Sequence, residues 1–155
     1  MPEVITTGTR APDAPRPPDA QVRYADPAAW LVCDLVGRAL RDWQGDRGPL
    51  AVLGVSEYAT GDTLRRVAAD VGKGTVSPLR FVAASPGTLV GLSCLQFGLH
   101  GPSLLLTMPP AEGLPVARVL AARWLAGAAP AVLLVTHEVD RSGTHRGTCE
   151  LLEAA

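Results

Sequence analysis

Apolar runs separated by polar or glycine- and proline-rich segments predict strands and helices that alternate along the chain. Residues 50–55 and 131–135 are short continuous apolar runs, typical of strands buried on both faces. Residues 26–43 and 62–71 carry apolar side chains at helical spacing. This alternation indicates an α/β layered fold with a mostly parallel sheet.

Two weaker patterns complete the predicted sheet. The β-branched run at residues 4–7 predicts a first strand, and residues 147–153 alternate weakly, as an edge or returning strand would. Asp26 before Pro27 is a typical helix start, and Asp62 is a candidate cap for the next helix.

The longest apolar stretch, residues 77–127, predicts a helix, a strand, a sharp corner and a second helix. The first helix is expected from Ser85–Pro86 to about residue 99, and it should be buried on several sides because its positions are apolar or small nearly all round. A Gly-Pro turn leads into strand 103–107, and the helix after the corner should span residues 113–126. Many α/β enzymes place a nucleophile at such a corner, but here it carries only Met, Pro and Pro.

Length and composition fit one domain over residues 1–155, with a proline-rich loop at 11–25. Hydrophobic residues make up 47% of the chain and charged residues 19%, enough to build a substantial core.

Charge and apolar patterning exclude several classes of function. The net charge is −1 and the basic residues form no cluster, so we expect no nucleic-acid binding. No apolar run approaches the roughly 20 residues of a membrane span. Three widely spaced cysteines (Cys33, Cys94 and Cys149) lie in apolar segments, which indicates buried thiols in a cytoplasmic protein. No pair of ligands has metal-site spacing, and we expect no metal or cofactor.

Four segments resemble the N-terminal half of the β-ketoacyl synthases, which have the thiolase fold. The most specific is F-V-A-A-S-P-G-T-L-V-G-L-S-C-L-Q-F-G-L-H-G-P-S-L at residues 81–104, which is similar to a helix, a "G-L-x-G-P-N" turn and the dimer strand of that family. L-L-T-M-P-P-A-E-G at 105–113 falls where the family carries Thr-Ala-Cys-Ala-Ser. Weaker similarity covers residues 124–138 and 140–153. The resemblance implies an α/β thiolase-like half-fold: a mixed, mostly parallel five-stranded sheet with helices on both faces, completed by dimerisation.

The departures from this family decide the expected chemistry. Pro109 or Pro110 replaces the cysteine that accepts the acyl group, and proline offers no nucleophile and no backbone N–H at that corner. The catalytic histidines and lysine of a ketosynthase belong to a C-terminal half that these 155 residues do not contain. We therefore expect no Claisen condensation by this chain alone.

The resemblance also implies a partner subunit. In the family, the strand before the corner pairs with its copy across a two-fold axis, so the predicted interface is Ser103, Leu104, Leu105, Leu106, Thr107 and Met108. The following helix is apolar on nearly every face and would expose a large apolar area on a monomer. We predict a homodimer or a heterodimer with a ketosynthase-family subunit. The candidates for lining an acyl pocket or facing a partner are Phe97, Val116, Leu120 and Trp124.

Polar residues near the corner are weaker catalytic candidates. His137 and Glu138 follow a buried strand, where open α/β sheets place ligands, and Glu112 lies just before the apolar helix. Acid–base catalysis by His137 with either glutamate competes with simple solvation or helix capping. His100 in a turn and His145 in a glycine-flanked loop are weaker candidates still.

Two hypotheses follow from the sequence. The first is a non-condensing ketosynthase-like subunit of a type II polyketide or fatty-acid-type pathway, which dimerises and helps to bind a chain carried on an acyl carrier protein. The alternative is an enzyme that reuses the half-fold for isomerisation, dehydration or cyclisation of a carrier-bound polyketide intermediate, with His137 as acid or base. Resemblance of fold alone does not choose between them.

Overall fold

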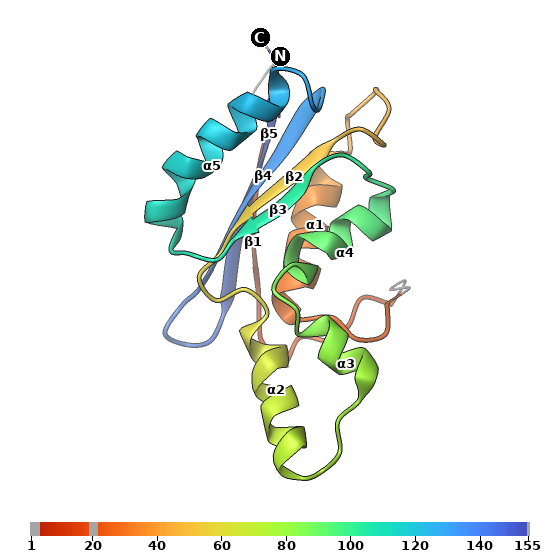
Figure 1. The fold of residues 1–155 in the computed structure, drawn as a ribbon, viewed down its shortest axis with the longest axis vertical. Helices are drawn as coiled ribbons and strands as arrows, with labels where there is room; N and C mark the ends of the chain where they lie inside the picture. The colour runs from red at the N-terminus through yellow and green to blue at the C-terminus, as the bar shows by residue number, and fades with distance from the viewer. Residues whose placement is uncertain (1–3, 19–21, 155) are drawn as a thin grey trace.

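A single five-stranded sheet forms the centre of the molecule (Figure 1). The computed structural model describes residues 4–18 and 22–154, so three residues of the proline-rich loop lie outside the described residues. The strands are arranged in the order β1-β5-β4-β2-β3. They are β1 (Val4–Arg10), β2 (Ala51–Val55), β3 (Ser103–Leu106), β4 (Ala131–Val139) and β5 (His145–Glu153).

The sheet is mixed. Strand β2 pairs in parallel with β3 and with β4, whereas β5 pairs antiparallel with both β4 and β1. The five-stranded α/β architecture is confirmed, but the sheet is not mostly parallel, because its last strand returns through a tight turn instead of a helix. Strand β5 is therefore an interior strand, and β1 is an edge.

Helices cover both faces of the sheet, as predicted (Figure 1). Apolar side chains of α1 and α4 pack on one face with residues of β2, β4 and β5. The opposite face is covered by α5, while α2 and α3 lie beyond one end of the sheet in Figure 1. The helices are α1 (Pro27–Ala39), α2 (Gly61–Gly72), α3 (Pro78–Ala83), α4 (Thr88–Phe97) and α5 (Pro110–Leu125).

Small residues bring α5 close to the sheet. Ala117 and Ala121 are buried against the core. A Cβ added at Gly113 would lie 2.3 Å from Val55 Cγ1, so only glycine fits at that position. The opposite, outward side of α5 faces away from the sheet, and Val116 and Val119 are exposed there.

Two expected helices differ from the structure. Helix α4 begins at Thr88, and it is buried on one side only, because the side chain of Leu95 is 77% exposed. Helix α5 begins at Pro110, directly at the corner, so Pro115 lies inside it and not in its first turn. The corner prolines supply a favourable helix start, since Pro at the first position lacks an N–H that would have no intrahelical partner anyway.

The buried carboxylate of Asp26 joins two helix N-termini. Its Oδ1 accepts the Ala28 N–H at 2.9 Å in the first turn of α1. Its Oδ2 accepts the Thr63 N–H at 2.8 Å in the first turn of α2. Asp26 has no exposed surface, and each contact satisfies a helix-end donor that would otherwise lack a partner. This carboxylate fixes α2 against the start of α1.

We predict that Asp26→Ala lowers the free energy of unfolding by about 2 kcal/mol, because two helix N-termini lose their acceptor. Asp26→Asn, which keeps one carbonyl oxygen, should cost roughly half as much. Urea denaturation measures both values, with the exposed Asp13→Ala as the control. Equal stability of Asp26→Ala and the unmodified protein would contradict this account.

Candidate functional site

Sheet register brings a serine and two histidines together at one end of the sheet. Val55 of β2 lies opposite Thr136 of β4, so Ser56 comes directly beside His137. On the other side of β4, His137 lies opposite Gly147 of β5, and His145 is its diagonal neighbour on the same face. The end of β2 and the distant hairpin of β4 and β5 thus supply one polar cluster.

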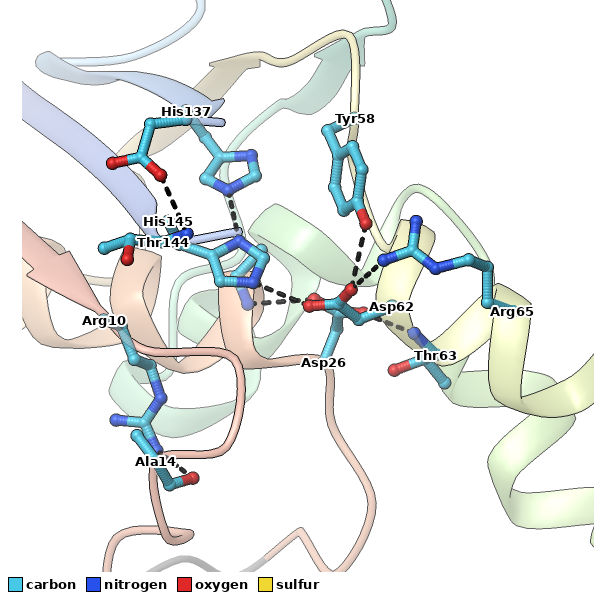
Figure 2. A network of polar contacts seen from close by, with 12 residues as sticks. Arg10, Ala14, Asp26, Tyr58, Asp62, Thr63, Arg65, His137, Thr144 and His145 are labelled. Carbon is cyan, nitrogen blue, oxygen red and sulfur yellow. Dashed lines mark hydrogen bonds and ion pairs between the residues drawn. The ribbon is translucent and has the colours of Figure 1, made fainter. Parts of the chain in front are cut away.

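The cluster is a continuous chain of hydrogen bonds that ends on helix α2, and Figure 2 shows its part from His137 through His145 to Asp62. Ser56 Oγ lies 2.7 Å from His137 Nδ1, and His137 Nε2 lies 2.9 Å from His145 Nδ1. His145 Nε2 lies 2.7 Å from Asp62 Oδ2. The two imidazole rings are stacked, with centroids 5.2 Å apart. Ser56, His137 and His145 are all fully buried.

With both imidazoles neutral, one arrangement of protons satisfies every contact. An ionised Asp62 only accepts, so His145 donates from Nε2 and accepts at Nδ1. His137 then donates from Nε2 and accepts the Ser56 hydroxyl proton at Nδ1. Ser56 Oγ accepts the Ala59 N–H at 2.8 Å, which completes the chain. In each hydrogen bond of this chain, the donor gives its proton to the neighbour that is nearer to Asp62.

The surroundings of His137 favour its neutral form. Burial, and next the neighbouring His145, lower the pKa of His137 to about 4. Desolvation disfavours a charged imidazole in the interior, and two protonated imidazoles side by side would repel each other. His137 is therefore uncharged at neutral pH, as the proton arrangement requires.

The loop after β2 closes the other side of Asp62. Tyr58 donates its hydroxyl to Asp62 Oδ1 at 2.9 Å, and Arg65 forms an ion pair with the same oxygen. Burial, followed by the hydrogen bond to Asp62, raises the pKa of Tyr58. The next residue, Ala59, has a φ of 46°, in the left-handed region that residues other than glycine rarely adopt. Strain of this kind accumulates where surrounding contacts fix the backbone, as the Ser56–Ala59 contact does here.

A pocket of about 530 Å³ lies beside this cluster, at the predicted corner. The structure brings Pro109, Pro110, His137 and Glu138 together around it, while Glu112 is exposed in the first turn of α5 and is not part of its wall. Both ring nitrogens of His137 are already hydrogen-bonded and the residue has no exposed surface. The other lining residues are Glu57, Tyr58, Val139, Asp140 and Arg146.

The structure corrects the predicted positions of three residues. Strand β4 continues to Val139, so His137 lies within the strand and not at its end. His145 is the first residue of β5 and fully buried, not part of a loop, because Asp140 Oδ1 accepts the N–H groups of Ser142 and Thr144 and tightens the turn. Asp62 is not the cap of α2, a position that Thr60 occupies.

One group could in principle hold a cation. Ligand atoms of Asp26, Asp62 and His145 lie within 4.8 Å of one another. Both oxygens of Asp26 already accept N–H groups at helix N-termini, and the positive ends of two helices disfavour a cation there. His145 Nε2 is bonded to Asp62. We assign no metal to these residues.

The predicted interface residues lie on one edge and one outer surface. Strand β3 pairs only with β2 among the described residues, and Ser103, Leu104 and Thr107 are exposed. On α5, Val116 points outward, whereas Leu120 and Trp124 are half-buried against the core. Phe97 packs against α1, where a Cβ on Gly37 would lie 2.8 Å from its ring, so it contributes to the core.

The cysteines are free thiols in the described structure. Cys33 and Cys149 are buried, and burial raises their pKa values to about 11 and about 12. Burial also raises the pKa of the half-buried Cys94. All three are therefore poor nucleophiles at neutral pH. Within the described residues, none of the helices has the length and apolar character needed to cross a membrane.

Residue patterns alone did not identify Ser56 or Tyr58 as parts of this site. The available signal was topological: a polar residue directly after a buried parallel strand lies beside the corresponding residue of its neighbour. Ser56 and His137 follow this rule once β2 and β4 are paired. Asp62 depends on the path of the loop between β2 and α2, which apolar periodicity does not report.

Comparison with solved structures assigns the fold. A chain of the ketosynthase–chain length factor complex (ApeO and ApeC) from Xenorhabdus doucetiae superposes with a TM-score of 0.71 at 15% identity, over 99% of this chain and 79% of the other. The ishigamide ketosynthase/chain length factor matches with a TM-score of 0.63 at 16% identity, over 83% of this chain and 41% of the other.

A third match is a chain of a type II polyketide synthase assembly (AntDE:AntF), described as an acyl carrier protein in complex with its ketosynthase bound to the hexaketide. Its TM-score is 0.58 at 15% identity, over 81% of this chain and 46% of the other. Neither the protein-family models nor the curated proteins gave a match. The chain therefore has the thiolase-like fold of ketosynthases and chain length factors, and it spans less than half the length of the second and third of these structures.

We predict that stability falls on acidification because of His137. Its pKa is about 4 in the folded protein and 6.5 for a free imidazole, so the unfolded chain binds more protons between these values. Its contribution is complete above about pH 6.5 and is lost as pH falls toward 4, with a total on the order of 3 kcal/mol. Denaturant unfolding at a series of pH values should show this slope in the unmodified protein.

The matched variants are His137→Gln, which removes the titrating group, and the exposed His100→Gln as control. His137→Gln should flatten the dependence on pH between about 4 and 6.5, and His100→Gln should leave it unchanged. The same slope in both variants would mean that other groups cause it.

Proposed function

We propose that this chain is a non-condensing ketosynthase-like subunit of a type II polyketide or fatty-acid-type pathway, which pairs with a ketosynthase-family subunit. The observation that carries the proposal is the edge strand β3 with its exposed Leu104, together with the exposed valines on the outward side of α5. An unpaired strand edge beside an apolar helix surface is a template for pairing with another chain.

The corner after β3 supports a non-condensing role. Strand, corner and helix are retained, but Pro109 and Pro110 carry no nucleophile and form the helix start. Among the polar residues around the adjacent pocket, no thiol is present. A subunit of this kind shapes a binding space without forming an acyl-enzyme bond.

Two of the solved structures with a similar fold support the choice of partner. One is a ketosynthase in complex with its chain length factor, and another is a carrier protein in complex with its ketosynthase. By analogy, the partner of this chain is a ketosynthase-family subunit or a second copy, and the ligand is an acyl chain carried on an acyl carrier protein. The pocket beside Pro109 and Pro110 is the space offered to that chain.

A second candidate function is acid–base chemistry on the carried chain, such as isomerisation, dehydration or cyclisation. It is favoured by one observation, the directed hydrogen-bond chain through His137 and His145 beside the pocket. Against it, His137 is buried and both of its nitrogens are occupied. Full activity of a His137→Ala variant in a reconstituted pathway would eliminate His137 as the acid or base.

We predict that Leu104→Lys and Val119→Lys each weaken assembly by about tenfold or more, because each places a charge on the proposed interface. Sedimentation measures assembly of the chain alone and mixed with ketosynthase-family subunits. Val71→Lys, at an exposed valine on α2, is the matched control and should assemble normally.

A chain that sediments as a monomer both alone and in the mixture would contradict the proposed pairing. Equal weakening by Val71→Lys would show a general effect of added charge and would also count against this interface. Circular dichroism of each variant establishes that the fold is retained.

A further inference from the structure

Two adjoining cavities lie on the other side of the molecule from α5, and neither takes part in the site described above. The first is an apolar groove of about 530 Å³ between α3, α4 and the segment before α1. The second is a polar cleft of about 330 Å³ between that segment, α2 and the proline-rich loop. The two share Arg23, Tyr24 and Ala25 as a common wall.

The groove is lined with apolar and small side chains. Leu79 and Val82 of α3 are each 64% exposed, and Leu95 of α4 forms the facing wall. Gly87 and Gly91 lie between these walls, and no atom lies within 4 Å of a Cβ built on either, so the floor is open. Cavities of this size with mainly apolar walls are typical of small-molecule sites.

The cleft is lined by four arginines. Arg16, Arg23 and Arg66 are exposed and form no ion pair or hydrogen bond with another described residue. Arg80 is neutralised by Asp70, with Nη1 at 2.5 Å from Oδ2. Asp13 is the acidic residue in the wall, so the cleft keeps a positive excess.

Tyr24 holds two of these arginines at the boundary between the cavities. The guanidinium carbons of Arg23 and Arg80 lie 6.0 Å and 5.6 Å from its ring centroid. A planar guanidinium binds a carboxylate through two parallel N–H contacts. The positive charge is therefore placed where the apolar groove ends.

We propose that the two cavities form one binding site for a carboxylate-headed amphiphile, with its alkyl chain in the groove and its head group among Arg16, Arg23 and Arg66. A small ligand fits better than a protein segment, because each cavity has the volume of a ligand pocket and charge and apolar surface are divided between them. The assignment does not depend on the proposed pairing through β3, although α4, which lines the groove, also contacts that strand.

The probe is dodecanoate below its micellar concentration, titrated into the full chain by isothermal calorimetry. We expect saturable binding at one site, weakened about tenfold by Arg23→Gln and by Arg66→Gln, since each removes a charged hydrogen-bond donor. Leu95→Asp should weaken binding at least as much by placing a negative charge in the groove. Arg123→Gln on α5, distant from both cavities, is the control and should bind normally.

The head group is tested separately. Dodecanol should bind about tenfold more weakly than dodecanoate, because it keeps the chain and loses the charge. Equal binding of dodecanol and dodecanoate would overturn the arginine assignment, and tighter binding of dodecyl phosphate would overturn the carboxylate.

If dodecanoate does not bind saturably to the folded chain, the proposed site is wrong. The proposal is also wrong if dodecanoate binds but none of the variants weakens its binding. Protection of Leu79 and Leu95 from hydrogen exchange by a partner protein, but not by dodecanoate, would assign the groove to a protein instead.

Discussion

The arrangement of this molecule depends on the carboxylate of Asp26, which accepts N–H groups from the first turns of two helices. Helix N-termini carry partial positive charge and unsatisfied donors, and a buried carboxylate without such donors would be costly. Asp26 supplies the acceptors that the two helix N-termini lack, and their N–H groups stabilise the buried carboxylate. With α2 held in this way, Asp62 is placed against His145, and the hydrogen-bond chain that crosses β5, β4 and β2 is completed.

The two ends of that chain have different character. At one end, Asp62 is surrounded by the hydroxyl of Tyr58, the guanidinium of Arg65 and an imidazole. At the other end, Ser56 is fully buried directly after β2. Buried polar networks that are fully satisfied specify a unique arrangement, because any register shift would leave several groups without partners. Here the network specifies how β2, β4 and β5 align and where the loop to α2 must run.

The strands, their α/β order and the two covered faces followed from the sequence, because continuous apolar runs and helical periodicity report burial directly. Predicted strand ends were less accurate: β4 and β5 extend to Val139 and back to His145, and polar side chains there pair across strands instead of facing solvent.

Of the candidate site, the corner at Pro109 and Pro110 and the presence of His137 were accessible from residue patterns. Ser56 and Tyr58 were not, because their contacts depend on loop paths and strand register that periodicity does not encode. Asp26 was predicted as the cap of α1, which the structure confirms, but its second contact, with the Thr63 N–H, was not predicted. Asp62 was noticed, but as a cap, since a carboxylate near a helix start ordinarily serves that role.

The position of β5 has a consequence for how the chain acquires its structure during synthesis. Strand β1 is made first of the five strands, yet its pairing partner is β5, with Val4 opposite Leu151. While a ribosome is still producing the intervening segments, β1 has no neighbour, and the α1 surface that β1 and β5 cover together stays open. Contacts so distant in sequence carry the largest loop-closure entropy, so sheet completion is a late event. Until then the nascent chain exposes apolar surface and an unpaired strand, the features that chaperones recognise.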